Sequence, residues 1–118
     1  MAIIGLHALI YSKKDEATRA FFRDVLGFPF VDAGRGWLIF AAPPAELAVH
    51  PAEDREYHEL YLMCDDIDAT VAELKRKGVT TRGIQEEAWG RVTQIRLPSG
   101  DELGLYEPKH PTAIGIKR

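Results

Sequence analysis

The first half of the chain changes from a strand-like to a helix-like spacing of apolar residues. Residues 3–11 form an apolar run around one histidine, which is typical of a β-strand. Ser12 follows with an acid three residues later, which is the spacing of a helix-capping box. Apolar residues at steps of three and four then predict a helix over residues 16–26, which Gly27 ends. Turn residues separate the three short strands expected after this helix, at residues 28–31, 36–41 and 46–50.

The second half repeats this order of elements. Residues 58–63 form another apolar run, and Asp65 and Asp66 offer a cap for the helix that follows it. That helix has apolar residues at positions i, i+4 and i+7. It ends at Gly78, after three cations that suit the negative end of the helix dipole. Strands are expected in the remainder, at residues 79–83, 91–97 and 102–106, with a hairpin turn over residues 98–101.

The two halves align with one another as a sequence repeat. His7 falls on His58 in the first strand of each half, and residues 46–50 fall on residues 102–106 in the last strand. A strand–helix–three-strand unit that occurs twice predicts an α+β fold of two βαβββ modules. The expected modules lie at about residues 3–51 and 57–108 of one domain that spans residues 1–118.

Composition and charge exclude several classes of protein. The 118-residue chain is 46% hydrophobic and 28% charged, which excludes a disordered or collagen-like chain. Its net charge is −3, so it lacks the basic surface that binds nucleic acid or anionic membranes. The apolar runs are too short to span a bilayer, and the N-terminus lacks a signal-peptide pattern. A single cysteine, Cys64, fits a reducing compartment. We therefore expect a cytoplasmic protein with neither nucleic acid nor membrane as a partner.

Several segments match the pattern of one known family. They are residues 20–28 (Ala-Phe-Phe-Arg-Asp-Val-Leu-Gly-Phe), 89–91, 97–100 and 103–108, together with His7 and His58. Over about residues 3–108 the chain resembles the vicinal oxygen chelate superfamily, which includes glyoxalase I, bleomycin-resistance proteins, fosfomycin-resistance thiol transferases and extradiol dioxygenases. The resemblance implies that each βαβββ module curls into a half-open, cup-shaped sheet. It also implies a homodimer that completes each cup across its interface, around a small-molecule substrate or ligand.

The resemblance also implies where a metal would bind. Members of the family with a full site carry ligands on the first and the fourth strand of each module. The first-strand positions match His7 and His58, which are candidate metal ligands. The fourth-strand positions, where the family often has glutamate, match Ala48 and Gly104, so both carboxylates are missing. The implied cofactor is a divalent ion (zinc, nickel, manganese or iron), or no metal at all.

Neighbours of the two substituted positions are candidates to replace the missing carboxylates. Residues two apart on a strand share a face, which places Glu102 beside Gly104 and both Glu46 and His50 beside Ala48. Such a neighbour lies about 6–7 Å along the strand, whereas a zinc–nitrogen bond measures about 2.0–2.1 Å. A long glutamate would reach the metal more easily than an imidazole. Glu102 is therefore the candidate catalytic carboxylate, which would transfer a proton beside a metal that polarises a substrate oxygen.

Aromatic and polar side chains are expected to line the cup. The candidate ligand-binding residues are Trp89, Tyr106, His50 and Glu46. Trp37 and Tyr61 fit either the lining of the cup or the core, whereas His110, which follows the last strand, is expected to be solvated.

Two functions from different classes remain open. The first is a metal-dependent lyase, isomerase or dioxygenase, in which His7 of one subunit and His58 of the other hold the ion. The second is a metal-free protein that sequesters a small apolar or drug-like molecule, with Ala48 and Gly104 widening the cup. An unrelated ferredoxin-like regulatory domain is disfavoured by the repeat.

Overall fold

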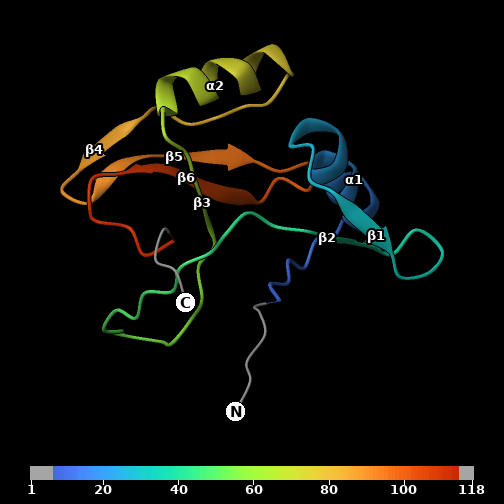
Figure 1. The fold of residues 1–118 in the computed structure, drawn as a ribbon, viewed down its shortest axis with the longest axis horizontal. Helices are drawn as coiled ribbons and strands as arrows, with labels where there is room; N and C mark the ends of the chain where they lie inside the picture. The colour runs from blue at the N-terminus through green and yellow to red at the C-terminus, as the bar shows by residue number, and fades with distance from the viewer. Residues whose placement is uncertain (1–6, 115–118) are drawn as a thin grey trace.

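The computed structural model describes residues 7–114 and has a mixed α+β fold, as the sequence predicts (Figure 1). The first half contains α1 (Asp15–Ala20), the π-helical turn η1 (Phe21–Val25), β1 (Phe30–Asp32) and β2 (Leu38–Phe40). The second half contains β3 (Tyr61–Met63), α2 (Ile67–Arg76), β4 (Gln85–Glu87), β5 (Gly90–Arg96) and β6 (Glu102–Pro108).

The second half forms a complete β–α–β–β–β unit. Its strands make one sheet in the order β3-β6-β5-β4, in which β3 is parallel to β6 and the other neighbours are antiparallel. Helix α2 lies across one face of this sheet (Figure 1). The strand expected at residues 79–83 is displaced along the chain. That segment makes a single bridge, from Thr81 to Ile95, and the edge strand β4 begins at Gln85.

Helix α2 forms where its local signals predict it. The Asp66 carboxylate accepts a hydrogen bond of 3.1 Å from the backbone N–H three residues later and so caps the first turn. One side of the helix buries Ile67, Val71 and Leu74, the residues of the predicted apolar stripe. Gly78 follows the helix with a φ of 80°, a left-handed conformation that costs glycine little.

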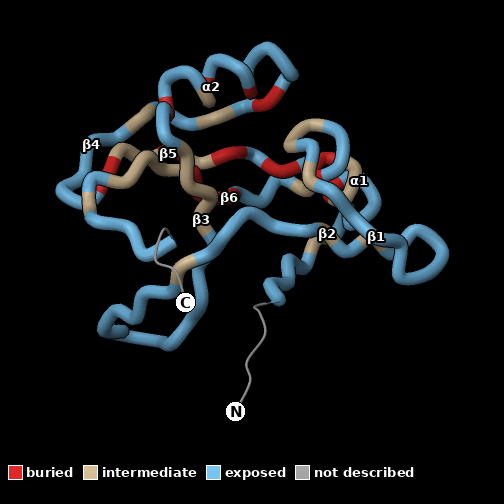
Figure 2. Tube along the Cα trace, viewed as in Figure 1, coloured by how far each residue is buried: buried red, intermediate tan, exposed pale blue. Residues whose placement is uncertain are grey.

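The hydrophobic core lies between the sheet and the helices (Figure 2). Strand alternation turns Ile95, Leu103 and Leu105 toward the core, and all three side chains are buried. Phe21 and Phe22 of η1 belong to the same cluster, so both halves of the chain contribute to one core. The alternate residues of β5 and β6 point to the opposite side of the sheet, which we call the open face.

The first half forms less of its expected module. The predicted helix is present as α1 and η1, and the β1–β2 hairpin pairs Phe30 with Phe40. The strand predictions for residues 7–11 and 46–50 are wrong for the single chain, since neither segment pairs as a strand and both are largely exposed (Figure 2). An apolar pattern yields a strand only where a neighbour binds its backbone, and β6 is already flanked by β3 and β5. Residues 3–6 of the first predicted strand lie outside the described residues.

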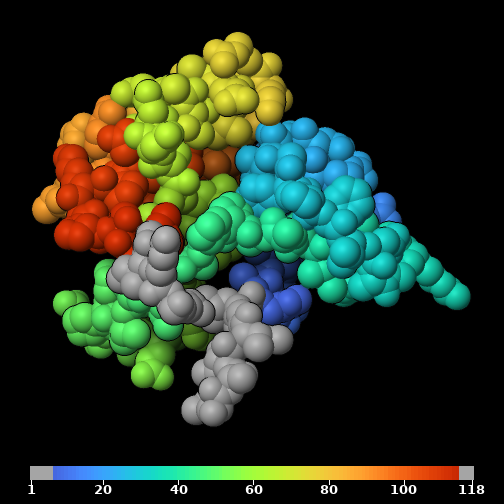
Figure 3. All heavy atoms as spheres, in the orientation of Figure 1, coloured from blue at the N-terminus to red at the C-terminus, as the bar shows by residue number. Residues whose placement is uncertain are grey.

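Residues 41–60 join the two halves without forming a helix or strand, and part of this segment projects away from the sheet (Figures 1 and 3). His58 therefore precedes β3 rather than lying within it, because the strand predicted over residues 58–63 begins at Tyr61. The arrangement as two equal modules stays a prediction. Across residues 7–114, no helix combines the length and the apolar character needed to cross a membrane.

Candidate ligand-binding site

Three aromatic side chains meet on the open face, and we call them the aromatic cluster. Tyr61 comes from β3, Trp89 from the turn between β4 and β5, and Tyr106 from β6. Their ring centroids are 5.4 Å apart for Trp89–Tyr106, 5.7 Å for Tyr61–Tyr106 and 6.2 Å for Tyr61–Trp89, with interplanar angles of 67°, 80° and 75°. These are edge-to-face contacts, each worth about 0.5–1.5 kcal/mol beyond burial.

Two glycines on the open face make room for the cluster. Gly104 pairs with Tyr61 across the parallel β3–β6 ladder, and a Cβ on Gly104 would overlap the Tyr61 ring. A Cβ on Gly90 would lie 3.0 Å from Cδ2 of Tyr106 and 2.7 Å from the carbonyl oxygen of Glu107. The Tyr61 ring thus fills the place where a side chain at position 104, such as the glutamate expected from the resemblance, would begin.

The Tyr106 hydroxyl belongs to a chain of hydrogen bonds that leads to the C-terminal side of β6. It lies 3.0 Å from Nε2 of His110, whose Nδ1 lies 2.8 Å from the carbonyl oxygen of Pro111. A carbonyl only accepts, so Nδ1 carries the hydrogen, and in the neutral imidazole Nε2 accepts from Tyr106. Burial and the negative charge of Glu46 raise the pKa of Tyr106, so its hydroxyl remains protonated. His110 is half-buried in this contact, and its expected solvation is wrong.

The segment that carries His110, residues 109–114, is held along the edge of the cluster, and we call it the C-terminal strap. The N–H of Lys109 donates to the carbonyl of Trp89 at 2.9 Å, and its Nζ lies 2.8 Å from Oε2 of Glu86. Further along, the N–H of Ala113 donates to Oε1 of Glu46 at 2.7 Å. The strap therefore connects the β4–β5 turn to the segment that contains Glu46.

The hydroxyl of Tyr61 also donates to a carboxylate. It lies 3.3 Å from Oε2 of Glu59, a long contact for an O–H donor. Burial is the main cause that raises the pKa of Tyr61, and the charge of Glu59 raises it further. Both phenols of the cluster are thus neutral groups whose hydrogens point at acceptors of the protein itself.

Glu102, the candidate catalytic carboxylate, is held by an arginine. Its Oε2 lies 2.6 Å from Nε of Arg82 and its Oε1 lies 2.8 Å from the terminal nitrogen, a two-point ion pair. The hydrogen bonds and the charge of Arg82 lower the pKa of Glu102. Both carboxylate oxygens are therefore engaged, and binding a metal or taking a proton would compete with the Arg82 ion pair.

The three histidines singled out by the sequence are exposed: His7, His50 and His58. Each lies in a segment without helix or strand. Within the described part of the chain, no three or more His, Cys, Asp or Glu side chains are grouped so as to hold a metal ion. With the space beside Gly104 filled and Glu102 engaged, the open face of this chain does not fit a divalent ion. The metal-ligand role of His7 and His58 stays a prediction, which this single chain leaves without a third ligand.

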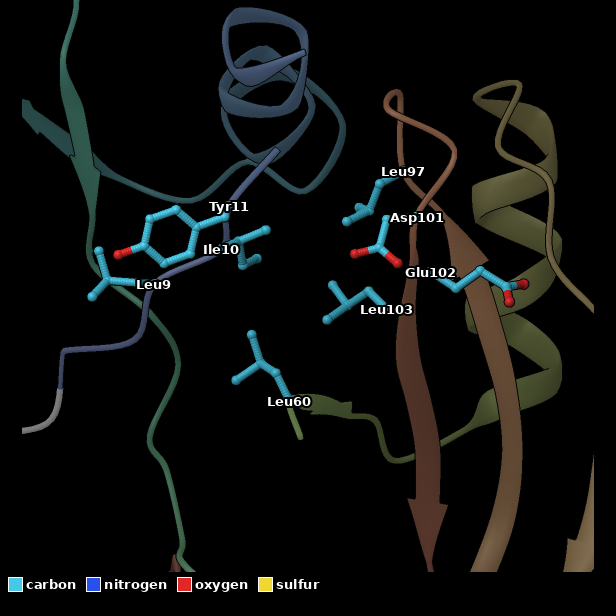
Figure 4. Close-up of a pocket in the computed structure, with 8 residues that line it drawn as sticks. All are labelled: Leu9, Ile10, Tyr11, Leu60, Leu97, Asp101, Glu102 and Leu103. Atoms are coloured by element: carbon cyan, nitrogen blue, oxygen red, sulfur yellow. The ribbon is translucent and has the colours of Figure 1, made fainter. Parts of the chain in front are cut away.

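Two cavities lie on the other side of the sheet. The first, of about 240 Å³, lies between residues 9–11, Leu60 and the beginning of β6 (Figure 4). Leu97 and Leu103 point into it, whereas the carboxylate of Glu102 points away (Figure 4). The second, of about 150 Å³, is lined almost entirely by apolar side chains, among them Ile95 of β5. Both are smaller than the usual range of ligand pockets, about 300–1,000 Å³.

The structure brings some of the predicted residues together and adds others. Trp89 and Tyr106 are in contact, and Glu46 reaches their edge through the C-terminal strap. The sequence leaves two interpretations for Tyr61, the core or the lining of the cup. The pairing of β3 with β6 places it over Gly104, on the open face. His110 gave no sequence signal, since its contact depends on the path of the strap.

Comparisons with known proteins agree with this fold. Residues 6–109 match the family model described as the Glyoxalase/Bleomycin resistance protein/Dioxygenase superfamily. The chain is similar to the crystal structure of TnmS3, an antibiotic binding protein from Streptomyces sp. CB03234. The TM-score is 0.68 at 27% identity, covering 92% of this chain and 99% of that one. A lactoylglutathione lyase from Agrobacterium tumefaciens gives a TM-score of 0.63 at 16% identity, covering 91% and 96%. A search of curated proteins finds no significant match.

Proposed function

Since the chain belongs to the Glyoxalase/Bleomycin resistance protein/Dioxygenase superfamily, we propose that it binds a small aromatic molecule on its open face without a metal ion. The observation that carries the proposal is the Tyr61 ring above Gly104. At the position where the resemblance implies a metal-binding carboxylate, this chain presents an aromatic surface. The site is built to stack a flat apolar ligand rather than to chelate an ion.

The cluster has the properties of such a surface. Tyr61 and Tyr106 are half-buried, and the Trp89 side chain is 41% exposed, so apolar ring area remains open to a ligand. The three rings fix one another through edge-to-face contacts, and rigid aromatic anchors lose little entropy on binding. The similarity to an antibiotic binding protein is consistent with this proposal and names no ligand for this chain.

The competing function is a metal-dependent enzyme, and one experiment separates the two. The metal-stripped protein, kept in EDTA, is titrated with 2-naphthol as the probe. Trp37 and Trp89 are the two tryptophans, so in the Trp37→Phe variant the single indole N–H signal in an NMR spectrum reports the cluster. We expect the signal to shift until it saturates, with a sub-millimolar dissociation constant for 2-naphthol.

Matched variants locate the binding. Tyr61→Ala should weaken 2-naphthol binding about tenfold through the lost ring contact, whereas Tyr11→Ala, which removes an 88% exposed tyrosine elsewhere, should leave it unchanged. If binding appears only after zinc is added, and is lost in both His7→Ala and His58→Ala, the proposal is wrong and the metal-dependent function replaces it.

We also propose that the protein is a homodimer. The two apolar segments that lack strand partners carry large exposed side chains: Tyr11 is 88% exposed and Val49 is 90% exposed. Unpaired apolar strand segments are a liability that a second copy removes by pairing with them.

Light scattering at micromolar concentration should give twice the chain mass of 13.2 kDa. Val49→Pro should favour the monomer, because proline cannot donate to a strand ladder, whereas Ala52→Pro should not. A monomeric native protein would contradict the proposal.

A further inference from the structure

The hydrogen-bond chain behind Tyr106 determines which polar groups the aromatic cluster offers to a ligand. The carbonyl oxygen of Pro111 fixes the hydrogen of His110 on Nδ1, at 2.8 Å. The lone pair on Nε2 then accepts a hydrogen bond from the Tyr106 hydroxyl, whose oxygen lies 3.0 Å away. A phenol has one hydrogen to donate, so the Tyr106 oxygen offers a ligand only its lone pairs, which accept.

The second phenol of the cluster also has its hydrogen engaged. Tyr61 donates its hydrogen to Glu59, and the side chain of Gln94 donates toward the Tyr61 oxygen, so Tyr61 has no free hydrogen to offer a ligand. A ligand stacked on the rings therefore meets no free phenolic hydrogen, and the oxygen left with an open acceptor site is that of Tyr106. A ligand hydroxyl or amino group would be satisfied at the Tyr106 oxygen. An ether or carbonyl oxygen at the same place would lie unpaired against another acceptor, which costs binding free energy.

Charge acts in the same direction. Glu46 and Glu59 lie close enough to the two phenols to affect their ionisation, so the nearby field is negative. Arg82, which extends over the same sheet, is already neutralised by Glu102. Lys109, whose backbone N–H bonds the carbonyl of Trp89, has its ammonium paired with Glu86 at 2.8 Å. An anionic ligand would thus meet carboxylates beside the rings, while Arg82 and Lys109 are each held by a carboxylate of the protein.

We propose that the Tyr106–His110 pair makes the open face selective for neutral or cationic aromatic ligands that carry a hydroxyl or amino donor. This inference rests on the proposed function and names the ligand class of that site. His110 acts through Tyr106, and it is a specificity-determining residue without touching the ring system of the ligand. The strap carries this selectivity because it supplies both His110 and the carbonyl that fixes its tautomer.

The test compares three probes of equal ring size on the metal-stripped protein: 2-naphthol, 2-methoxynaphthalene and 2-naphthoate. At pH 7.5, below a phenol pKa of about 10, 2-naphthol is neutral and donates. We expect it to bind about tenfold more tightly than the methyl ether, the effect of one hydrogen bond. Its affinity should exceed that of 2-naphthoate by at least the same factor. Equal affinities for 2-naphthol and the ether, or tighter binding of 2-naphthoate, would overturn the inference.

The variant His110→Ala isolates the role of the pair. It frees the hydroxyl of Tyr106 to donate to a ligand, so the ratio of the two dissociation constants should fall toward one. Lys109→Ala, which removes the neighbouring strap contact to Glu86, should keep the wild-type ratio. A ratio that His110→Ala leaves unchanged would refute the assignment. In a separate measurement, imidazole nitrogen chemical shifts should show the hydrogen of neutral His110 on Nδ1, and a hydrogen on Nε2 would equally refute it.

The three probes distinguish a failure of the proposed function from a failure of the selectivity. If none of the three probes binds the native protein, the proposed function is wrong. If 2-naphthol and its ether both bind but with equal affinity, the site exists and the selectivity assigned to Tyr106 and His110 is wrong.

Discussion

Replacing Gly104 by alanine is the most direct test of the open face. A single methyl group at this position would overlap the Tyr61 ring, which lies over the glycine across the β3–β6 ladder. The β-strand backbone has little freedom to move, since β6 is paired on both sides. The Tyr61 side chain must therefore rotate away, and in doing so it leaves Trp89 and Tyr106.

The magnitude follows from what the rotation removes. Tyr61 makes two edge-to-face contacts, with centroids 6.2 Å from Trp89 and 5.7 Å from Tyr106. At about 0.5–1.5 kcal/mol for each pair, their loss costs about 1–3 kcal/mol. If the ring stays and the strand yields instead, overpacking costs about the same, 1–3 kcal/mol. Gly104→Ala should lower the free energy of unfolding by an amount in this range by either route.

A double-mutant cycle measured by urea unfolding at fixed protein concentration tests this origin. In a Tyr61→Ala background the overlap is absent, so Gly104→Ala should be neutral or slightly stabilising, because alanine suits a strand better than glycine. The coupling between the two positions should be about 1 kcal/mol or more. Gly83→Ala is the control, since a Cβ there meets no atom within 4 Å. The reasoning is refuted if Gly104→Ala costs the same with and without the Tyr61 ring.

Two further predictions concern Glu102 and the cap of α2. In Arg82→Ala the pKa of Glu102 should rise toward its usual value near 4.5, measured by NMR titration of the carboxyl carbon. Arg82 lowers the pKa in the folded state, so the stability it adds is present above the unfolded-state pKa and is lost as the pH falls through the lowered value. The variant should therefore lose less stability on acidification, and an unchanged pKa would contradict the ion pair. Asp66→Ala should cost about 0.5–2 kcal/mol of unfolding free energy, more than Asp65→Ala, and equal costs would argue against the cap.

Local signals explain why the second half could be predicted from its sequence. The local signals all belong to α2 and its two ends: the cap at Asp66, the buried stripe of Ile67, Val71 and Leu74, and the left-handed Gly78. Each is a short-range preference that tertiary packing reinforces. The strands β5 and β6 are explained in the same way, because their alternate residues are buried in the core to which α2 contributes.

The partner of a strand is not encoded in this local way. Residues 7–11 and 46–50 have the apolar pattern of strands, yet they stay unpaired and exposed in the single chain. Alternation specifies which face of a strand is buried, but the hydrogen bonds that hold the strand come from a neighbour that the pattern does not name. The displaced edge strand β4 has the same cause, since the segment before it pairs with β5 only at the single bridge from Thr81 to Ile95.

The register of β3 against β6, which the sequence does not specify, changes the interpretation of Gly104. From the sequence, Gly104 was a carboxylate position without its carboxylate. The parallel pairing of β3 with β6 shows that the glycine is required by the Tyr61 ring above it. Without that register, Tyr61 remained open between core and cup, and the aromatic cluster lacked the residue that touches both Trp89 and Tyr106.

The same complementarity is present in the first half of the sequence. The repeat that aligns His7 with His58 places Ile10 at the position of Tyr61, and the repeat of the last strands places Ala48 at the position of Gly104. In each half, the repeat thus aligns a small residue of the last predicted strand with a large residue of the first predicted strand. If a second copy supplies the pairing that residues 7–11 and 46–50 lack, Ile10 would cover Ala48 as Tyr61 covers Gly104. Losing both carboxylates is then one coherent change, from a face that chelates to a face that packs, rather than two separate defects of a metal site.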